Sequence, residues 1–294
     1  GHILYVFNGR VPKRPRGTYV EWLGAVSGDT SETLWTDVLS YHQLPRVLDP
    51  QSGWLQNAND PPWTTTFPAV LDPARFPPYL APQFMHFRAQ QSASMLAADE
   101  SISFEELVDS KHSTRMLLAD RLLDDLIDAV HEHGGETVRR SAEVLAAWDR
   151  SAEADSKGAV LFARWADRMD LARVAFAYND EARRLMGETF VTVWDPSAPF
   201  STPSGLKARR RAAEVLGTVA EEILEEHGDL AVTWGDVHRL RYGGRDLPAN
   251  GAEGDPIGVF RTSWMGPGEA TGPSPAMAGA GFSPPADSPP PLRP

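Results

Sequence analysis

The pattern of residues changes at Pro82, and this change constrains the fold more than any other feature of the sequence. From Ser27 to Pro82 the chain is rich in proline, aspartate, threonine and tryptophan with little helical periodicity, which predicts a long ordered loop region with short strands. After Pro82, apolar residues recur mostly at helical spacing. Loops this long are usually functional or belong to something larger. The two parts together predict an α+β fold.

Helices and strands are expected at definite places along the chain. The expected helices cover 83–96, 136–149, 158–170, 171–186 and 206–226, and one more runs from a capping box at Ser103–Glu106 to about Val130. The buried face of this last helix is expected at Leu107, Leu118, Leu122, Leu126 and Val130. Gly228 is placed to end the 206–226 helix. The expected strands or extended segments cover 3–7, 18–26, 191–194, 230–234, 237–242 and 257–260, with a loop over 246–255.

These elements divide the chain into four regions. Residues 1–82 form a strand and loop region, 83–228 a mainly helical layer, and 229–262 a second strand region. Residues 263–294 are almost entirely glycine, proline, alanine and serine, so they are expected to be a disordered tail or an out-of-frame translation. Because the chain starts with Gly1 just before an apolar run, and a natural start would have methionine, the N-terminus is interpreted as a cut end.

Composition excludes several classes of function. The net charge of -12 argues against nucleic acid or an anionic membrane as a partner. No apolar run approaches the roughly 20 residues of a membrane span. With no cysteine, neither a disulfide nor a thiolate zinc site can form.

The stretch from Pro45 to Trp63 is the first candidate for a functional site. Asn57 and Asn59 flank Ala58, so in an extended backbone their amides point to the same side. Neutral amide donors of this kind suit an oxyanion. The alternative is a turn-rich loop in which these side chains bond to the local backbone.

Two further groups of residues invite a catalytic interpretation. Ser110, His112 and Ser113 lie within an expected helix, where residues two apart point away from each other, so a helix surface is the preferred interpretation. Asp236 and His238 follow an expected strand and point to one side if extended. They form either a catalytic carboxylate–imidazole pair or a structural one.

Metal and sugar sites have only compositional support. Five loop aspartates offer oxygen ligands that suit calcium, namely Asp29, Asp37, Asp49, Asp60 and Asp72. No twelve-residue calcium-loop pattern accompanies them, so solvated turn residues are the default interpretation. Four tryptophans in the same region are read either as a sugar-binding face or as core: Trp22, Trp35, Trp54 and Trp63.

Five segments over about 1–261 stand out together: GHILYVFNGRVPKRP, LPRVLDPQSGWLQNANDPPW, ISFEELVDSKHSTRMLLADRLL, WGDVHRLRYGGRDLP and GDPIGVFR. In this order they resemble the β-subunit of the penicillin acylase family of N-terminal nucleophile hydrolases. The resemblance implies part of an αββα sandwich with a helical insertion. The implied reaction cleaves an acyl group from an amide such as a β-lactam, an acyl-homoserine lactone or a lipopeptide, with no required cofactor.

The resemblance also implies roles for individual residues. The nucleophile of the family is a serine at the mature N-terminus of the β-subunit, whose own α-amino group acts as the base. An asparagine of the Asn-x-Asn motif donates to the oxyanion, a role carried to Asn59, with Asn57 as the second choice. Arg88 resembles an arginine near the active site, and Asp236 or His238 resembles residues that orient the N-terminal amine.

The nucleophile of the family lies upstream of the position that matches Gly1. The α-subunit and the first part of the β-subunit are therefore the expected partners, and the chain alone is predicted to be inactive. The family implies a periplasmic or secreted location after precursor self-cleavage. The alternative function is a non-catalytic protein whose tryptophan-rich loops bind an acyl or sugar ligand.

Overall fold

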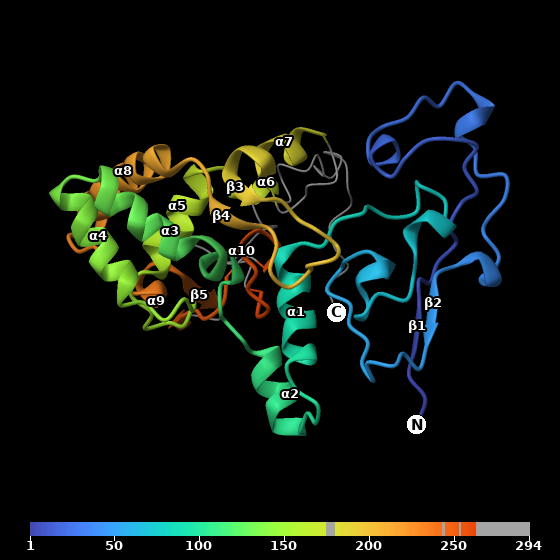
Figure 1. Cartoon of the computed structure of the whole chain (residues 1–294), viewed down its shortest axis with the longest axis horizontal. Helices are drawn as coiled ribbons and strands as arrows, with labels where there is room; N and C mark the ends of the chain where they lie inside the picture. Colours follow the sequence, from blue (N-terminus) through green and yellow to red (C-terminus); the bar gives the residue numbers. More distant parts are fainter. Residues whose placement is uncertain (175–179, 243–244, 253, 263–294) are drawn as a thin grey trace.

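The chain divides in space where its composition changes. The computed structural model describes residues 1–174, 180–242, 245–252 and 254–262, and the predicted tail at 263–294 lies outside them. Figure 1 shows the N-terminal region, in blue, on one side of helix α1 (Phe87–Ala97) and a body of helices on the other side. The expected helix over 83–96 is therefore present, starting four residues later because His86 is its N-terminal cap.

The N-terminal region is held by one short sheet and several single turns. Strand β1 (Leu4–Val6) pairs antiparallel with β2 (Arg46–Leu48). The strand expected at 18–26 is wrong, because Val20–Trp22 forms a 3₁₀ turn there. The Glu21 carboxylate accepts hydrogen bonds from the Thr18 N–H and hydroxyl at 2.6 and 2.8 Å, which curls this segment locally. The other 3₁₀ turns are Ser31–Thr33, Tyr41–Gln43, Pro62–Thr64 and Pro73–Arg75.

The helix expected from Ser103 to about Val130 is in fact two helices. The capping box at Ser103 and Glu106 is confirmed and opens α2 (Phe104–Lys111), while α3 (Leu117–His133) starts after a break. The break forms because residues 114–116 run beside residues 150–152, with the Met116 N–H donating to the Arg150 carbonyl at 2.8 Å. Helix α2 projects away from the body (Figure 1), so Leu107, predicted to be buried, is 50% exposed.

Helices α3, α5 and α8 pack into one large hydrophobic core. The predicted buried face of α3 is confirmed, since its leucines and Val130 are at most 2% exposed apart from Leu117 at 7%. The indole N–H of Trp165, the largest fully buried side chain, donates to the Ala212 carbonyl at 3.1 Å, so its one polar group has a hydrogen-bond partner. The helices of this body after α3 are α4 (Glu136–Ala146), α5 (Ala159–Arg168), α6 (Leu171–Val174), α7 (Asp180–Thr189) and α8 (Arg209–His227).

The expected end of α8 is confirmed. Gly228 adopts the left-handed conformation at φ 75°, and its N–H bonds to the Leu224 carbonyl. The helix expected over 171–186 is described only as α6 and the start of α7, since residues 175–179 lie outside the described part of the chain.

The remaining strands form two small antiparallel sheets. The strand expected at 191–194 is β3 (Phe190–Thr192), which pairs with β4 (Ser204–Leu206). The extended segment expected at 237–242 is β5 (Arg239–Tyr242), and its partner β6 (Arg245–Pro248) lies inside the segment predicted to be a loop. The strands predicted at 230–234 and 257–260 are wrong: the chain instead turns there into the short helices α9 (Trp234–Val237) and α10 (Gly254–Ile257).

The fold is therefore a mixture of helices with small sheets, as the α+β prediction requires. The described residues contain three two-stranded sheets, and no larger sheet is formed by them. None of the described helices is both long and apolar enough to span a membrane.

Candidate active site

The candidate site is a loop whose shape is fixed by the carboxylate of Asp60. This carboxylate accepts from the Ala58 N–H at 2.7 Å, from Gln56 Nε2 at 2.7 Å, and from the hydroxyl of Thr64. Gln56 Nε2 also donates to the Thr64 carbonyl at 2.8 Å. Ala58 and Thr64 are buried while the amides on either side of Ala58 face outward. The Asp60 carboxylate therefore fixes the loop through bonds to its buried residues, and Asn57 and Asn59 stay at the surface.

The backbone at Asn59 is not extended, so the condition under which the two amides would point to the same side is not met. Asn59 has φ 65°, in the left-handed region that asparagine tolerates better than most residues. Its N–H donates to Asn57 Oδ1 at 2.9 Å, which closes a local turn. The side chain of Asn57 is thus engaged by the backbone, as the turn-rich interpretation of this stretch expects.

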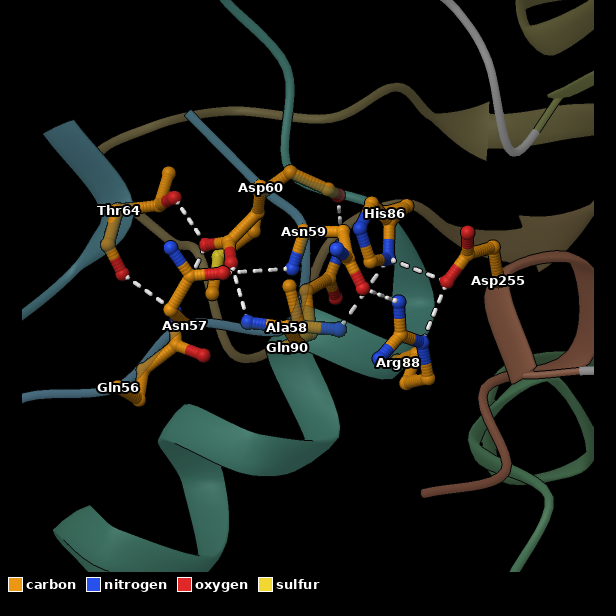
Figure 2. A network of polar contacts seen from close by, with 12 residues as sticks. Gln56, Asn57, Ala58, Asn59, Asp60, Thr64, His86, Arg88, Gln90 and Asp255 are labelled. Carbon is orange, nitrogen blue, oxygen red and sulfur yellow. Dashed lines mark hydrogen bonds and ion pairs between the residues drawn. The ribbon is translucent and has the colours of Figure 1, made fainter. Parts of the chain in front are cut away.

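The Asn59 amide is oriented by Arg88. Arg88 Nη2 donates to Asn59 Oδ1 at 2.8 Å, as Figure 2 shows. Because a guanidinium has no acceptor, the amide atom facing it must be the oxygen. No other described group bonds to Asn59 Nδ2, which leaves two N–H donors directed away from Arg88.

Arg88 is in turn held by Asp255, a residue that the sequence analysis did not single out. Arg88 Nε lies 2.6 Å from Asp255 Oδ1, and the two side chains are only 15% and 22% exposed. Space for this contact depends on Gly254, since a Cβ there would lie 2.4 Å from Arg88 Cδ. Asp255 lies in GDPIGVFR, one of the segments that suggested the family, but its partner is 167 residues away.

His86 completes the network on the buried side. Its Nδ1 lies 3.4 Å from Asp255 Oδ1 and 3.3 Å from the Ala89 N–H, which it caps. Burial lowers the pKa of His86, and the charge of Arg88 acts in the same direction, against the opposing effect of the Asp255 and Asp60 carboxylates. The imidazole is therefore neutral near pH 7, and Asp255 has Arg88 as its charged partner.

Asp236 and His238 lie elsewhere in the fold. Asp236 accepts from the Thr233 hydroxyl at 2.7 Å at the start of α9, and His238 stacks on the Trp234 ring at 3.6 Å. Helix α9 lies apart from α1 in Figure 1. Within the described chain neither side chain contacts Asn59 or Arg88.

The serine and histidine after α2 form no catalytic pair. His112 follows the last residue of α2, and its Nδ1 lies 2.9 Å from the Val108 carbonyl. This backbone contact, together with exposure on a projecting helix, agrees with the helix-surface interpretation of this segment.

The five loop aspartates are spread over separate local contacts. Asp37 pairs with Lys13 at 2.6 Å, Asp72 caps the turn at Ala74 at 2.9 Å, and Asp60 anchors its own loop. Asp49 contacts His2, and Asp29 contacts Ser27. Among the described residues, no three carboxylate or imidazole side chains gather as a metal site would require.

The four tryptophans of the N-terminal region differ in burial and in the groups they contact. Trp63 is buried in one apolar cluster, Trp54 packs against another, and Arg14 covers the ring of Trp22 at 3.7 Å. Trp35 is 65% exposed. The four rings therefore have different surroundings, and two of them contribute to apolar clusters as the core interpretation expects.

Comparison with known proteins identifies the fold and then the family. The structure of a thermostable penicillin G acylase from Alcaligenes faecalis superposes with a TM-score of 0.52 at 16% identity, over 88% of this chain and 50% of that one. The chain therefore has the fold of part of a penicillin acylase. The penicillin amidase family model matches residues 1–282, so the chain belongs to the penicillin amidase family.

A curated relative agrees with this assignment. Penicillin acylase 2 proenzyme from Pseudomonas sp. (strain SE83) is 26% identical over 253 residues, which cover 82% of this chain and 31% of the relative. The chain thus spans less than a third of that relative's length. The expectation that the resemblance stops near Arg261 is wrong, because the family match continues to residue 282, into the segment predicted to be a tail.

Proposed function

We propose that this chain is part of an acylase that hydrolyses amide bonds, and that Asn59 supplies an oxyanion donor to its active site. The observation that carries the proposal is the orientation of the Asn59 amide. Arg88 Nη2 donates a hydrogen bond to Asn59 Oδ1 at 2.8 Å, which leaves the Nδ2 hydrogens to donate to a ligand. A preorganised neutral donor of this kind stabilises the negative charge that develops on a carbonyl oxygen during acyl transfer.

The Asn59 donor also meets a geometric requirement of catalysis. A donor that must turn toward the oxyanion during the reaction loses much of its effect, so a fixed amide is worth more than a mobile one. The loop is fixed by Asp60 on one side and by Arg88 and Asp255 on the other. Asn57 is the weaker candidate because its Oδ1 is already engaged with the Asn59 N–H.

The remaining parts of the machinery are assigned to a partner. The proposed nucleophile is an N-terminal serine of the β-subunit that self-cleavage exposes. Both this serine and the α-subunit belong to sequence outside this chain. The αββα sandwich would be completed by the same segments. The 31% coverage of a relative described as a proenzyme supports this division. The proposed reaction needs no cofactor, and the proposed location is periplasmic or secreted.

The substrate is proposed as a small acyl amide: a β-lactam, an acyl-homoserine lactone or a lipopeptide. In the test, two proteins are assayed on one amide of each kind: the purified chain by itself, and the restored full-length protein that contains it. The chain alone should give no turnover above background, and the full-length protein should cleave at least one class. Turnover by the isolated chain, or none by a processed full-length protein, would reject the proposal.

A further inference from the structure

The residue that caps helix α1 is a histidine, which is an unusual choice. Helices are most often capped by serine, threonine, aspartate or asparagine, whose side-chain oxygen accepts from a free backbone N–H. Here Nδ1 of His86 accepts from the Ala89 N–H at 3.3 Å. Because Nδ1 accepts, the proton of the neutral ring is on Nε2, which is buried. A smaller residue would cap the helix equally well, so the imidazole points to a second role.

The same nitrogen of His86 also faces the ion pair of the candidate site. Nδ1 lies 3.4 Å from Asp255 Oδ1, and this oxygen accepts from Arg88 Nε at 2.6 Å. Arg88 is the second residue of α1, so the cap and the arginine belong to one helical turn. Figure 2 shows the ring beside both side chains. While Nδ1 carries no proton it is an acceptor that faces another acceptor, so Asp255 Oδ1 bonds to Arg88 rather than to the ring.

Protonation of the ring changes which groups are bonded. With a proton on Nδ1, His86 no longer accepts from the Ala89 N–H and instead donates to Asp255 Oδ1. The imidazolium then competes with Arg88 for one carboxylate oxygen, and the two cations repel each other. Arg88 Nη2 is the group that bonds to Asn59 Oδ1 at 2.8 Å. A guanidinium that loses its carboxylate partner therefore also loses its fixed position beside the Asn59 amide.

We propose that His86 is a positioning residue: the neutral ring keeps Arg88 in place and the Asn59 amide directed toward its ligand, and protonation of the ring releases that amide. The part of this inference that concerns the oxyanion rests on the proposed function, whereas the link from His86 to Arg88 does not. The charged groups that face the ring are Asp255 on α10, Asp60 in the site loop and Arg88 on α1.

The release is confined to acid pH. Burial lowers the pKa of His86, and the charge of Arg88 acts in the same direction, while the Asp255 and Asp60 carboxylates oppose them. The N-terminus of α1 also disfavours a cation at its cap. The ring therefore takes up a proton only below the ordinary histidine pKa of 6.5. The Asn59 amide is held near pH 7 and released as the pH falls.

The first experiment tests the link between the two side chains by NMR of the purified, isotope-labelled chain. The Arg88 Nε–H signal, assigned by its absence from Arg88→Gln, is followed from about pH 8 down to the pH at which circular dichroism reports unfolding. It should shift with the same midpoint as the ring signals of His86. The shift should vanish in His86→Asn, which keeps a capping oxygen and cannot take up the proton.

The matched control for this experiment is His238→Asn. Burial lowers the pKa of His238 as well, but its ring stacks on Trp234, away from the site. This variant should keep the shift of the Arg88 signal. The link is overturned by an Arg88 signal that ignores the titration of His86, by a shift that persists in His86→Asn, or by a His86 ring that takes up no proton before the chain unfolds.

The second experiment tests whether the link reaches the chemistry in the processed full-length protein. As the pH falls, kcat of the wild type should drop at least about tenfold more than kcat of His86→Asn, because only the wild type releases an oxyanion donor. Titration of the proposed nucleophile's amine is common to both proteins and cancels in this comparison. At about pH 8, His86→Ala should have a lower kcat than His86→Asn, because alanine provides no cap.

The two experiments fail in distinguishable ways. Equal acid losses of kcat in the wild type and in His86→Asn would overturn the positioning role. A processed wild type that turns over no amide would instead reject the proposed function, and the NMR titration would still decide whether His86 controls Arg88.

Discussion

The ion pair between Arg88 and Asp255 should contribute strongly to stability, and a double-mutant cycle measures this directly. The variants are Arg88→Gln, Asp255→Asn and the combination of the two. The atoms lie 2.6 Å apart and the side chains are 15% and 22% exposed. Removing one partner of a fully buried pair costs about 3–5 kcal/mol, because the other charge stays buried without compensation.

Partial exposure reduces that cost. We expect each single variant to lower the free energy of unfolding by about 2–4 kcal/mol, and the coupling energy of the cycle to be about 2 kcal/mol. The measurement is urea unfolding followed by tryptophan fluorescence, with the slope checked for two-state behaviour. Arg88→Gln should also release the Asn59 amide, because it removes the guanidinium that bonds Oδ1.

The control is an ion pair with the same nitrogen–oxygen distance but with exposed side chains. Arg184 and Glu188 lie 2.6 Å apart on α7, and their side chains are 60% and 58% exposed. Their coupling energy should stay at about 0.5 kcal/mol or less, as for other exposed pairs four residues apart on a helix. A coupling at Arg88 and Asp255 no larger than this would refute the argument that burial makes the site pair strong.

Two further predictions concern stability. Burial lowers the pKa of His238 from 6.5 to about 4 in the folded protein. Between these two pH values the unfolded chain binds more protons at His238 than the folded protein does. The free energy of unfolding should therefore fall by about 3 kcal/mol as the pH drops from 6.5 to 4. Urea midpoints across this range should show a smaller loss in His238→Phe, and an identical profile would contradict the assignment. Gly254→Ala should destabilise by about 1–3 kcal/mol, because its Cβ would lie 2.4 Å from Arg88 Cδ. Gly187→Ala on α7, where a Cβ meets nothing within 4 Å, should be neutral or stabilising by up to about 1 kcal/mol in the same unfolding assay; equal effects would contradict the steric argument.

Local signals predicted much of the secondary structure. The capping box at Ser103 and the glycine at Gly228 act on the residues beside them, so the sequence alone locates the start of α2 and the end of α8. The spacing of leucines on α3 likewise identifies the buried face. These features depend on the backbone within one or two turns, which a sequence pattern records.

Long-range contacts account for the errors. The break before α3 exists because the Met116 N–H bonds to the Arg150 carbonyl, and β1 pairs with β2, whose residues lie 40 to 44 positions further along the chain. No local pattern at either place records its partner. The same limit applies to the candidate site: the amides could be named from the motif, but the left-handed turn at Asn59 and the link to Asp255 depend on contacts formed only in the fold.

The oxyanion role of Asn59 is tested most directly by one substitution made at two positions. In the restored full-length protein, Asn59→Asp replaces the free N–H donors with a negative charge, whereas Asn57→Asp keeps the oxygen that accepts the Asn59 N–H at 2.9 Å. We expect Asn59→Asp to lower kcat by at least about 10²–10³ and Asn57→Asp to change it less than about tenfold. Normal turnover by Asn59→Asp, in correctly processed enzyme, would contradict the account.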